Sequence, residues 1–195
     1  MILTRNTTDL RRLVTKHVAA DQVVQGQYWY QNRGCFIGCL NHGDDPRSAE
    51  AEFGLPIIVQ RIAESIFEGL PAEEAKAFFA ALPDAVHSDG MDLSRVGWHF
   101  FAIELRSLPK QPDEIQAVIK PVITGIDLLA AGQDWPVANA AALAADYAVW
   151  AAAAAYAAIN AAYAAGAAAD SLNARRRQRD LLLRLIYESP IGDNQ

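Results

Sequence analysis

The chain has 195 residues, of which 52% are hydrophobic and 21% are charged, and its formal net charge is −6. This length suits one domain with a substantial core, and the composition excludes intrinsic disorder and a collagen-like chain. Residues 61–134 carry twelve acidic and six basic side chains, so the negative charge is local. This charge disfavours nucleic acid as a partner, because a phosphate backbone requires a basic face.

The cysteine content points to a reducing compartment. Two cysteines are too few for the disulfide framework of a secreted protein, and the first residues contain no apolar run typical of a signal peptide. We therefore expect a cytoplasmic protein with free thiols.

The first expected element is a helix that starts near Thr7 and runs to about Val24, where Gly26 follows as a stop signal. Its apolar positions recur every three to four residues and include a histidine, His17. From 25 to 45 this pattern breaks, and glycines, cysteines and aromatic residues are concentrated there.

Proline and glycine mark the helices of the middle of the chain. A helix is expected from about Pro56 to Glu68, with Gly69 closing it. The next opens at Pro71 and stops at Pro83, because proline lacks the N–H group that a helix interior requires.

Two further helices follow a polar loop. One is capped by Asp92 or Ser94 and continues through Leu105, and the other starts at Asp113. Within the second, Pro121 predicts a kink.

An alanine-rich helix is expected over 136–170, where 21 of the 37 alanines lie. Its large apolar residues fall on two nearly opposite sides, which is typical of a helix buried on several sides. The sequence therefore predicts an all-α fold, a single-domain helical bundle of residues 1–195 around this central helix, with a C-terminal helix over 171–188. The central helix would be about 50 Å long. Since a domain of this size measures about 40 Å, the helix either bends or packs against a second copy in a homodimer.

The same segment imitates a membrane span. The 23 residues from Tyr147 to Ala169 carry no charge, and arginines follow them. Alanine is nearly neutral for insertion, however, and Asn160 lies in the middle, so membrane insertion is disfavoured.

The residues with the most chemistry lie in the motif region, 25–45. Cys35, Cys39 and His42 are separated by three and two residues, and His17 lies on the preceding helix. Thiolate and imidazole are good zinc ligands, so these four residues form a candidate metal site. The CxxC spacing of zinc knuckles is absent, and the chain has no motif for any other cofactor. We therefore expect no cofactor, and zinc is the one alternative that these residues leave open.

Two catalytic or binding interpretations of the motif region stay open beside the metal site. In the first, Cys35 or Cys39 is a nucleophile with His42 or His17 as its base. In the second, a ligand pocket has Tyr28 and Trp29 as aromatic walls and Arg33 as an anion clamp.

A structural interpretation competes with all three. Gly34 and Gly38 alternate with the two cysteines, and all four are small residues that allow a tight helix crossing. Free cysteine is a small hydrophobic residue that is usually buried.

Acidic side chains in the middle of the chain are candidate contacts to a protein partner. If the protein inhibits a nucleic-acid-handling complex, its acidic residues replace phosphate on a basic surface. The candidates are Glu64, Glu68, Glu73 and Glu74.

Several stretches together resemble an uncharacterised group of bacterial and phage-encoded proteins. These proteins have a GCAVGC-like core followed by ELGIP-like and IFEGLP-like runs, and the present chain differs by having Phe36-Ile37 between its Gly-Cys pairs. The matching stretches are Ala20–Tyr28, Arg33–Gly43, Glu52–Pro56 and Ile62–Pro71. The resemblance implies a phage or prophage accessory protein and no assigned activity.

The chain carries no complete catalytic signature, which favours a non-enzymatic helical protein that acts by binding a protein partner. The alternative is a small metal- or thiol-dependent enzyme or sensor with its site at Cys35, Cys39 and His42.

Overall fold

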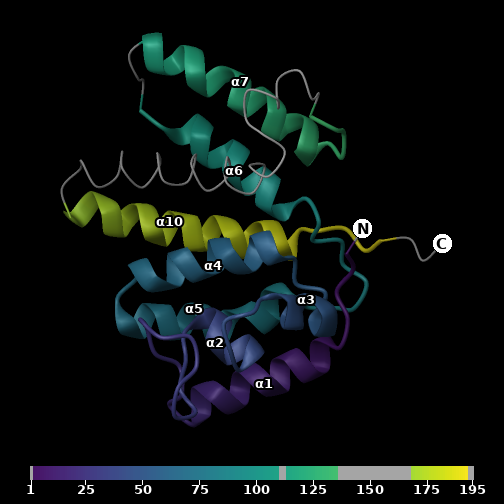
Figure 1. Ribbon diagram of the computed structural model, residues 1–195, viewed down its shortest axis with the longest axis vertical. Coiled ribbons are helices and arrows are strands. Elements are labelled where there is room, and N and C mark those ends of the chain that lie inside the picture. Colours follow the sequence, from purple (N-terminus) through teal and green to yellow (C-terminus); the bar gives the residue numbers. More distant parts are fainter. Residues whose placement is uncertain (1, 110–112, 136–167, 193–195) are drawn as a thin grey trace. The chain divides into compact units, whose positions relative to one another are not determined.

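The computed structural model describes residues 2–109, 113–135 and 168–192 (Figure 1). Over these ranges the chain forms eight helices, and β-structure is limited to isolated bridges. The prediction of an all-α fold is therefore confirmed. The chain divides into two compact units, Met1–Ser94 with Arg175–Gln195, and Arg95–Ala174. A single domain over 1–195 stays a prediction.

The predicted alanine-rich helix over 136–170 lies almost entirely outside the described residues, and so do its central position and its role in a homodimer. Only its last residues belong to a described helix, α10 (Ala168–Tyr187), which covers the predicted C-terminal helix 171–188 to within a few residues. No helix in the described part of the chain is long and apolar enough to cross a membrane.

The first unit contains five complete helices besides most of α10. They are α1 (Thr7–Ala19), α2 (Phe36–Asn41), α3 (Arg47–Phe53), α4 (Ile57–Gly69) and α5 (Ala72–Ala85). Pro56 and Pro71 directly precede α4 and α5, because the fixed φ of proline suits the start of a helix. Pro83, predicted as the stop of α5, lies inside its last turn.

The first helix is shorter than predicted. It ends at Ala19 instead of Val24, and Asp21 takes a positive φ of 52°. Beyond it the backbone pairs with Gly34, whose N–H donates to the carbonyl of Gln22 and whose carbonyl accepts the Val24 N–H, both at 2.9 Å. The predicted continuation was wrong because this pairing joins residues that no local pattern connects.

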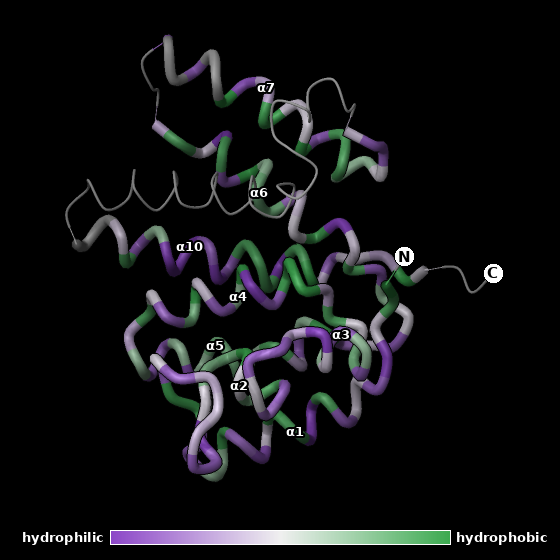
Figure 2. The backbone as a smooth tube through the Cα atoms, viewed as in Figure 1, coloured by the Kyte–Doolittle hydropathy of each residue, from purple (hydrophilic) through white to green (hydrophobic). Residues whose placement is uncertain are grey.

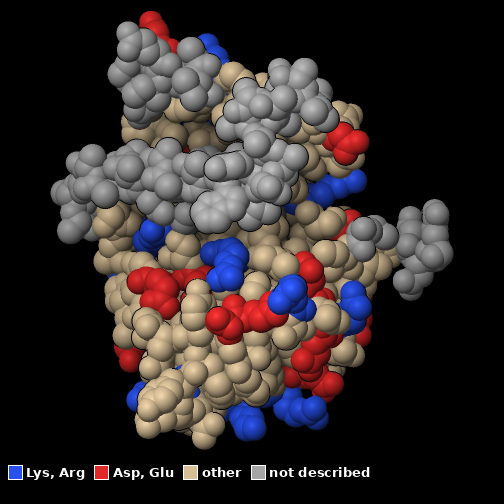
Figure 3. Space-filling view, viewed as in Figure 1, with Lys and Arg blue, Asp and Glu red and all other residues tan. Residues whose placement is uncertain are grey.

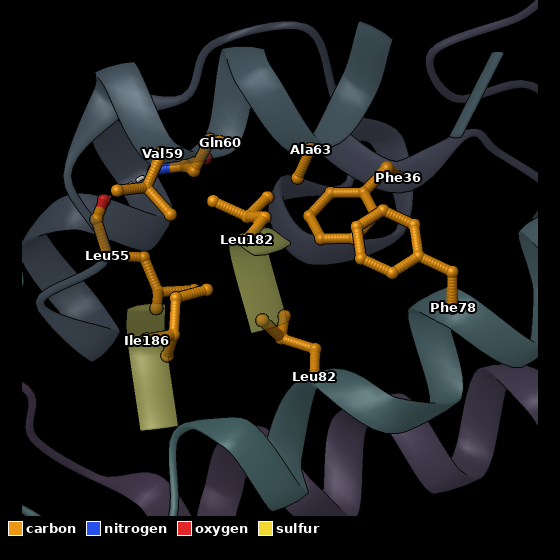
Figure 4. Close-up of a pocket in the computed structure, with 9 residues that line it drawn as sticks. All are labelled: Phe36, Leu55, Val59, Gln60, Ala63, Phe78, Leu82, Leu182 and Ile186. Carbon is orange, nitrogen blue, oxygen red and sulfur yellow. Dashed lines mark hydrogen bonds between the residues drawn. The ribbon is translucent and has the colours of Figure 1, made fainter. Parts of the chain in front are cut away.

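The core of this unit lies between α2, α4, α5 and α10. The Phe36 ring packs against Phe67 and Phe79, with centroid distances of 6.2 and 5.4 Å. Leu182 and Ile186 of α10 point into the same apolar region (Figure 4). The space left there is about 10 Å³, no more than one water molecule needs. Hydrophobic residues recur at intervals along α4 and α10 (Figure 2), as expected of helices that bury one face.

The second unit contains α6 (Val96–Ser107) and α7 (Asp113–Ala130), which pack against each other. The ring of Trp135 occupies the place of a side chain at Gly125, since a Cβ there would lie 2.1 Å from the ring. The α7 helix ends before Gly132, whose positive φ of 73° glycine adopts without strain.

Candidate functional site

The motif region begins with a tight hairpin. Tyr30 and Arg33 exchange two backbone hydrogen bonds, of 2.9 and 3.0 Å. The two residues between them, Gln31 and Asn32, have positive φ angles of 49° and 60°. Two successive positive φ values define a type I′ turn, which matches the natural twist of a hairpin. We call residues 27–33 the aromatic hairpin.

The aromatic hairpin lies directly on α2. A Cβ at Gly38 would lie 1.3 Å from the carbonyl oxygen of Tyr28, and a Cβ at Gly34 would lie 2.1 Å from the same atom. Any side chain at either position would therefore displace the hairpin. The small residues permit close packing, as the structural interpretation expects, but their neighbour is a hairpin and not a helix.

Both cysteine side chains are sealed inside the unit, at 1% exposure for Cys35 and 0% for Cys39. Burial raises the pKa of Cys39 to about 12, and its thiol donates to the carbonyl of Gly34 at 3.1 Å. Burial also raises the pKa of Cys35, and a hydrogen bond from its thiol to the Glu64 carboxylate raises it further. Since only the thiolate is a nucleophile or a metal ligand, these surroundings oppose both roles.

One group of three metal-ligating side chains occurs in the described part of the chain. It consists of Cys35, Glu64 and Glu68, whose ligand atoms lie within 4.8 Å of one another. Glu64 accepts the N–H of Ile37 at 2.8 Å, and burial raises the pKa of Glu64. Glu68 accepts the N–H of Gly26 at 3.0 Å. The two carboxylates thus attach α2, and the residue directly before the aromatic hairpin, to α4.

The two predicted histidine ligands meet each other. His17 on α1 is 2% exposed, whereas His42, the residue that ends α2, is exposed. Their Nε2 atoms are 3.0 Å apart, and Nδ1 of His17 lies 2.7 Å from Oε1 of Gln22. Trp29 stacks on His42 with a centroid distance of 4.5 Å. We call His17 and His42 the histidine pair.

The predicted metal site is therefore divided. Its two histidines form the histidine pair, and within the described residues neither Cys35 nor Cys39 completes a three-ligand group with them. Burial lowers the pKa of His17, so its ring is neutral at pH 7.

The predicted pocket residues point in different directions. Trp29 is turned toward His42, while Tyr28 is 44% exposed and its hydroxyl accepts from Arg61 at 3.3 Å. Arg33 lies 3.7 Å from the Asp21 carboxylate. The interpretation of Tyr28, Trp29 and Arg33 as a ligand site stays a prediction.

An open cleft of about 560 Å³ lies beside His42. It is formed by α1, the end of α2 and α3, and its wall carries both acidic and basic side chains. The polar residues that line it are Asp9, Arg12, Lys16, Asn41, His42, Ser48 and Glu52. Its volume suits a small polar molecule.

Of the four predicted partner-contact glutamates, Glu74 already has a charged neighbour inside the fold. Arg176 of α10 donates to it at 2.9 Å and holds its pKa below the ordinary range. Glu73 has a side chain that is 89% exposed and lies 4.0 Å from Lys76. Acidic and basic side chains lie next to one another on the visible described surface (Figure 3).

Several polar residues that position this site escaped the sequence analysis. Gln22 orients His17, and Gln60 donates to the carbonyls of Pro46 and Leu55 at 2.9 and 2.7 Å. An isolated glutamine is not part of any sequence motif. The one signal is that Gln60 falls on the buried face of α4, where a polar side chain requires hydrogen-bond partners.

No protein family, curated protein or solved structure matches this chain. The resemblance of its Gly-Cys core and IFEGLP run to bacterial and phage-encoded proteins therefore stays a prediction.

Proposed function

We propose that the chain is a non-enzymatic binding protein that attaches to a partner protein through the aromatic hairpin. The observation that carries the proposal is the exposure of Tyr28 and Tyr30, 44% and 64%, on a turn held by two backbone hydrogen bonds. Large aromatic side chains presented to solvent on a fixed turn are typical of a protein contact surface.

The chemistry of the hairpin suits this role. Tyrosine and arginine are enriched at the energetically important positions of protein interfaces. Arg33 is paired with Tyr30 through the backbone, and Arg61 donates to the Tyr28 hydroxyl. The turn is already ordered in the free protein, so binding costs little further conformational entropy. The sealed thiols give no comparable support to the thiol-dependent alternative.

The proposal also includes the cellular location and the origin of the protein. Free, buried cysteines suit the cytoplasm, and the resemblance to phage-encoded proteins supports an accessory role in a phage or prophage. The partner is then a protein of the phage or of its bacterial host.

A photo-crosslinking amino acid tests the surface directly. We would place it at Tyr30 in the full chain and, as a matched control, at Tyr187, which is 60% exposed on α10. In bacterial cells, position 30 should give one discrete crosslinked protein that position 187 does not. Equal crosslinks from both positions would contradict the proposal.

Purified components then separate binding from stability. Against the crosslinked protein, Tyr30→Ala and Tyr28→Ala should each weaken affinity by about tenfold or more, as expected of interface hot spots. Tyr187→Ala should leave affinity unchanged. Unchanged affinity in both hairpin variants would overturn the assignment of this surface.

A further inference from the structure

The two rings of the histidine pair meet through one nitrogen each. They meet head to head, with Nε2 atoms 3.0 Å apart, centroids 5.1 Å apart and ring planes at 83°. His17 comes from α1 and His42 from the end of α2, so two separate elements direct these nitrogens toward one point.

Gln22 determines which nitrogen of His17 carries the proton. Its amide oxygen lies 2.7 Å from Nδ1, and because an amide oxygen only accepts, Nδ1 must donate. Nε2 of the neutral ring therefore presents a lone pair toward His42. Metal-binding histidines typically donate their other N–H to such a neighbour, which fixes both tautomer and ring orientation.

His42 is held in place by two independent features. Its φ of 49° is in the left-handed region, which costs a residue other than glycine, asparagine or aspartate some strain. Its ring stacks on Trp29 at an interplanar angle of 29°. The left-handed backbone at the end of α2 places the exposed imidazole beside the buried one, and the Trp29 ring supports it there.

We infer that the histidine pair binds a divalent transition-metal ion through the two Nε2 atoms. Imidazole favours copper, nickel and zinc among such ions. Two imidazole nitrogens on a tetrahedral zinc ion lie about 3.3 Å apart. The present separation of 3.0 Å is close to that value, so the two nitrogens need to part only slightly around an ion.

The remaining coordination positions face solvent. His42 forms part of the wall of the 560 Å³ cleft, which gives water or a small ligand access to the ion. Within the described residues no third histidine, cysteine, aspartate or glutamate joins the pair at ligand distance. The site therefore has two protein ligands, fewer than the four of a closed structural zinc site or the three of a catalytic one, and water or a small ligand would fill the open positions.

The test is a zinc titration of the full, tag-free chain by isothermal calorimetry. The wild type should bind one ion, and His42→Asn should weaken binding by about tenfold or more, since it removes one of two imidazole ligands. Asparagine tolerates the left-handed backbone, so this variant should keep its fold. His99→Asn, at an exposed histidine of α6, is the matched control and should bind as the wild type does.

Gln22→Glu adds a measurement that a purely structural role would not move. A carboxylate that accepts from Nδ1 makes the ring a stronger ligand, so this variant should bind zinc more tightly than the wild type. Electron paramagnetic resonance of the copper-loaded chain should count two ligand nitrogens.

Four outcomes would overturn the inference. The first is an absence of zinc binding by the folded wild type, and the second is equal affinity in His42→Asn. The third is a loss of zinc in Cys35→Ser but not in His42→Asn, which would place the ion at Cys35, Glu64 and Glu68 instead. Histidine ring nitrogen NMR signals that stay unchanged under excess zinc would identify the pair as a simple hydrogen bond.

Discussion

Two faces of one short segment have opposite environments. Residues 34–39 bury both cysteines against the aromatic hairpin and α4, and we call them the cysteine face. The aromatic hairpin and His42 form the open face, where tyrosine, arginine and histidine side chains reach solvent. Thiol and imidazole are both residue types that can bind metals or act in catalysis. The difference shows that surroundings decide which of them is available for chemistry.

The largest expected effect comes from breaking the contact between the two faces. Gly38→Ala places a Cβ on the carbonyl of Tyr28, so the hairpin cannot dock and the free energy of unfolding should fall by about 3 kcal/mol or more. Chemical denaturation measures this. Gly43→Ala is the control, because the nearest atom to its Cβ is 3.9 Å away, and it should change stability by less than about 0.5 kcal/mol. Similar losses in both variants would contradict the close approach.

The second prediction concerns the solvent accessibility of the two thiols on the cysteine face. Both cysteines of the native protein should react with iodoacetamide at pH 8 about 100-fold more slowly than those of the unfolded chain, because only opening of the unit exposes them. Mass spectrometry after timed quenching reports each cysteine separately. Fast labelling of Cys35 or Cys39 in the native protein would show that the cysteine face is open to solvent. It would then support the thiol-dependent alternative.

Glu64 tests whether the cysteine face is sealed. Its pKa is raised by burial, so the folded state holds the proton more tightly than the unfolded state, whose value is near 4.5. Stability contributed by the protonated group is complete below that value and is lost as pH rises through the folded pKa. Between pH 4 and pH 7, the free energy of unfolding of Glu64→Gln should therefore increase relative to that of the wild type as pH rises. Chemical denaturation of both proteins measures this. Parallel curves would show that Glu64 is well solvated.

The sequence predicted best what is encoded locally. Pro56, Gly69 and Pro71 mark the bounds of α4 and the start of α5 because proline and glycine act on the backbone of their own residues. The apolar spacing of the first helix placed His17 inward, where it is buried. The alanine-rich helix over 136–170 stays a prediction.

What the sequence could not supply are the contacts between distant residues. The end of α1 depends on pairing with Gly34, and the role of Gln22 depends on where the ring of His17 points. The sequence spacing likewise predicted that Cys35, Cys39 and His42 form one site. In the structure the cysteine side chains are buried, whereas His42, which follows α2, is exposed. Residues close in sequence can thus lie on opposite faces of one turn.

The smallest expected effect on stability is that of a substitution on the open face. Tyr30→Ala should change the free energy of unfolding by less than about 0.5 kcal/mol, because its side chain is 64% exposed and little packing is lost. Chemical denaturation measures this change, with Tyr187→Ala as the control because Tyr187 has a similar exposure. A loss above about 1.5 kcal/mol would mean that Tyr30 supports the fold as the cysteines do. The open face would then be part of the core, and its exposed aromatics would no longer argue for a partner.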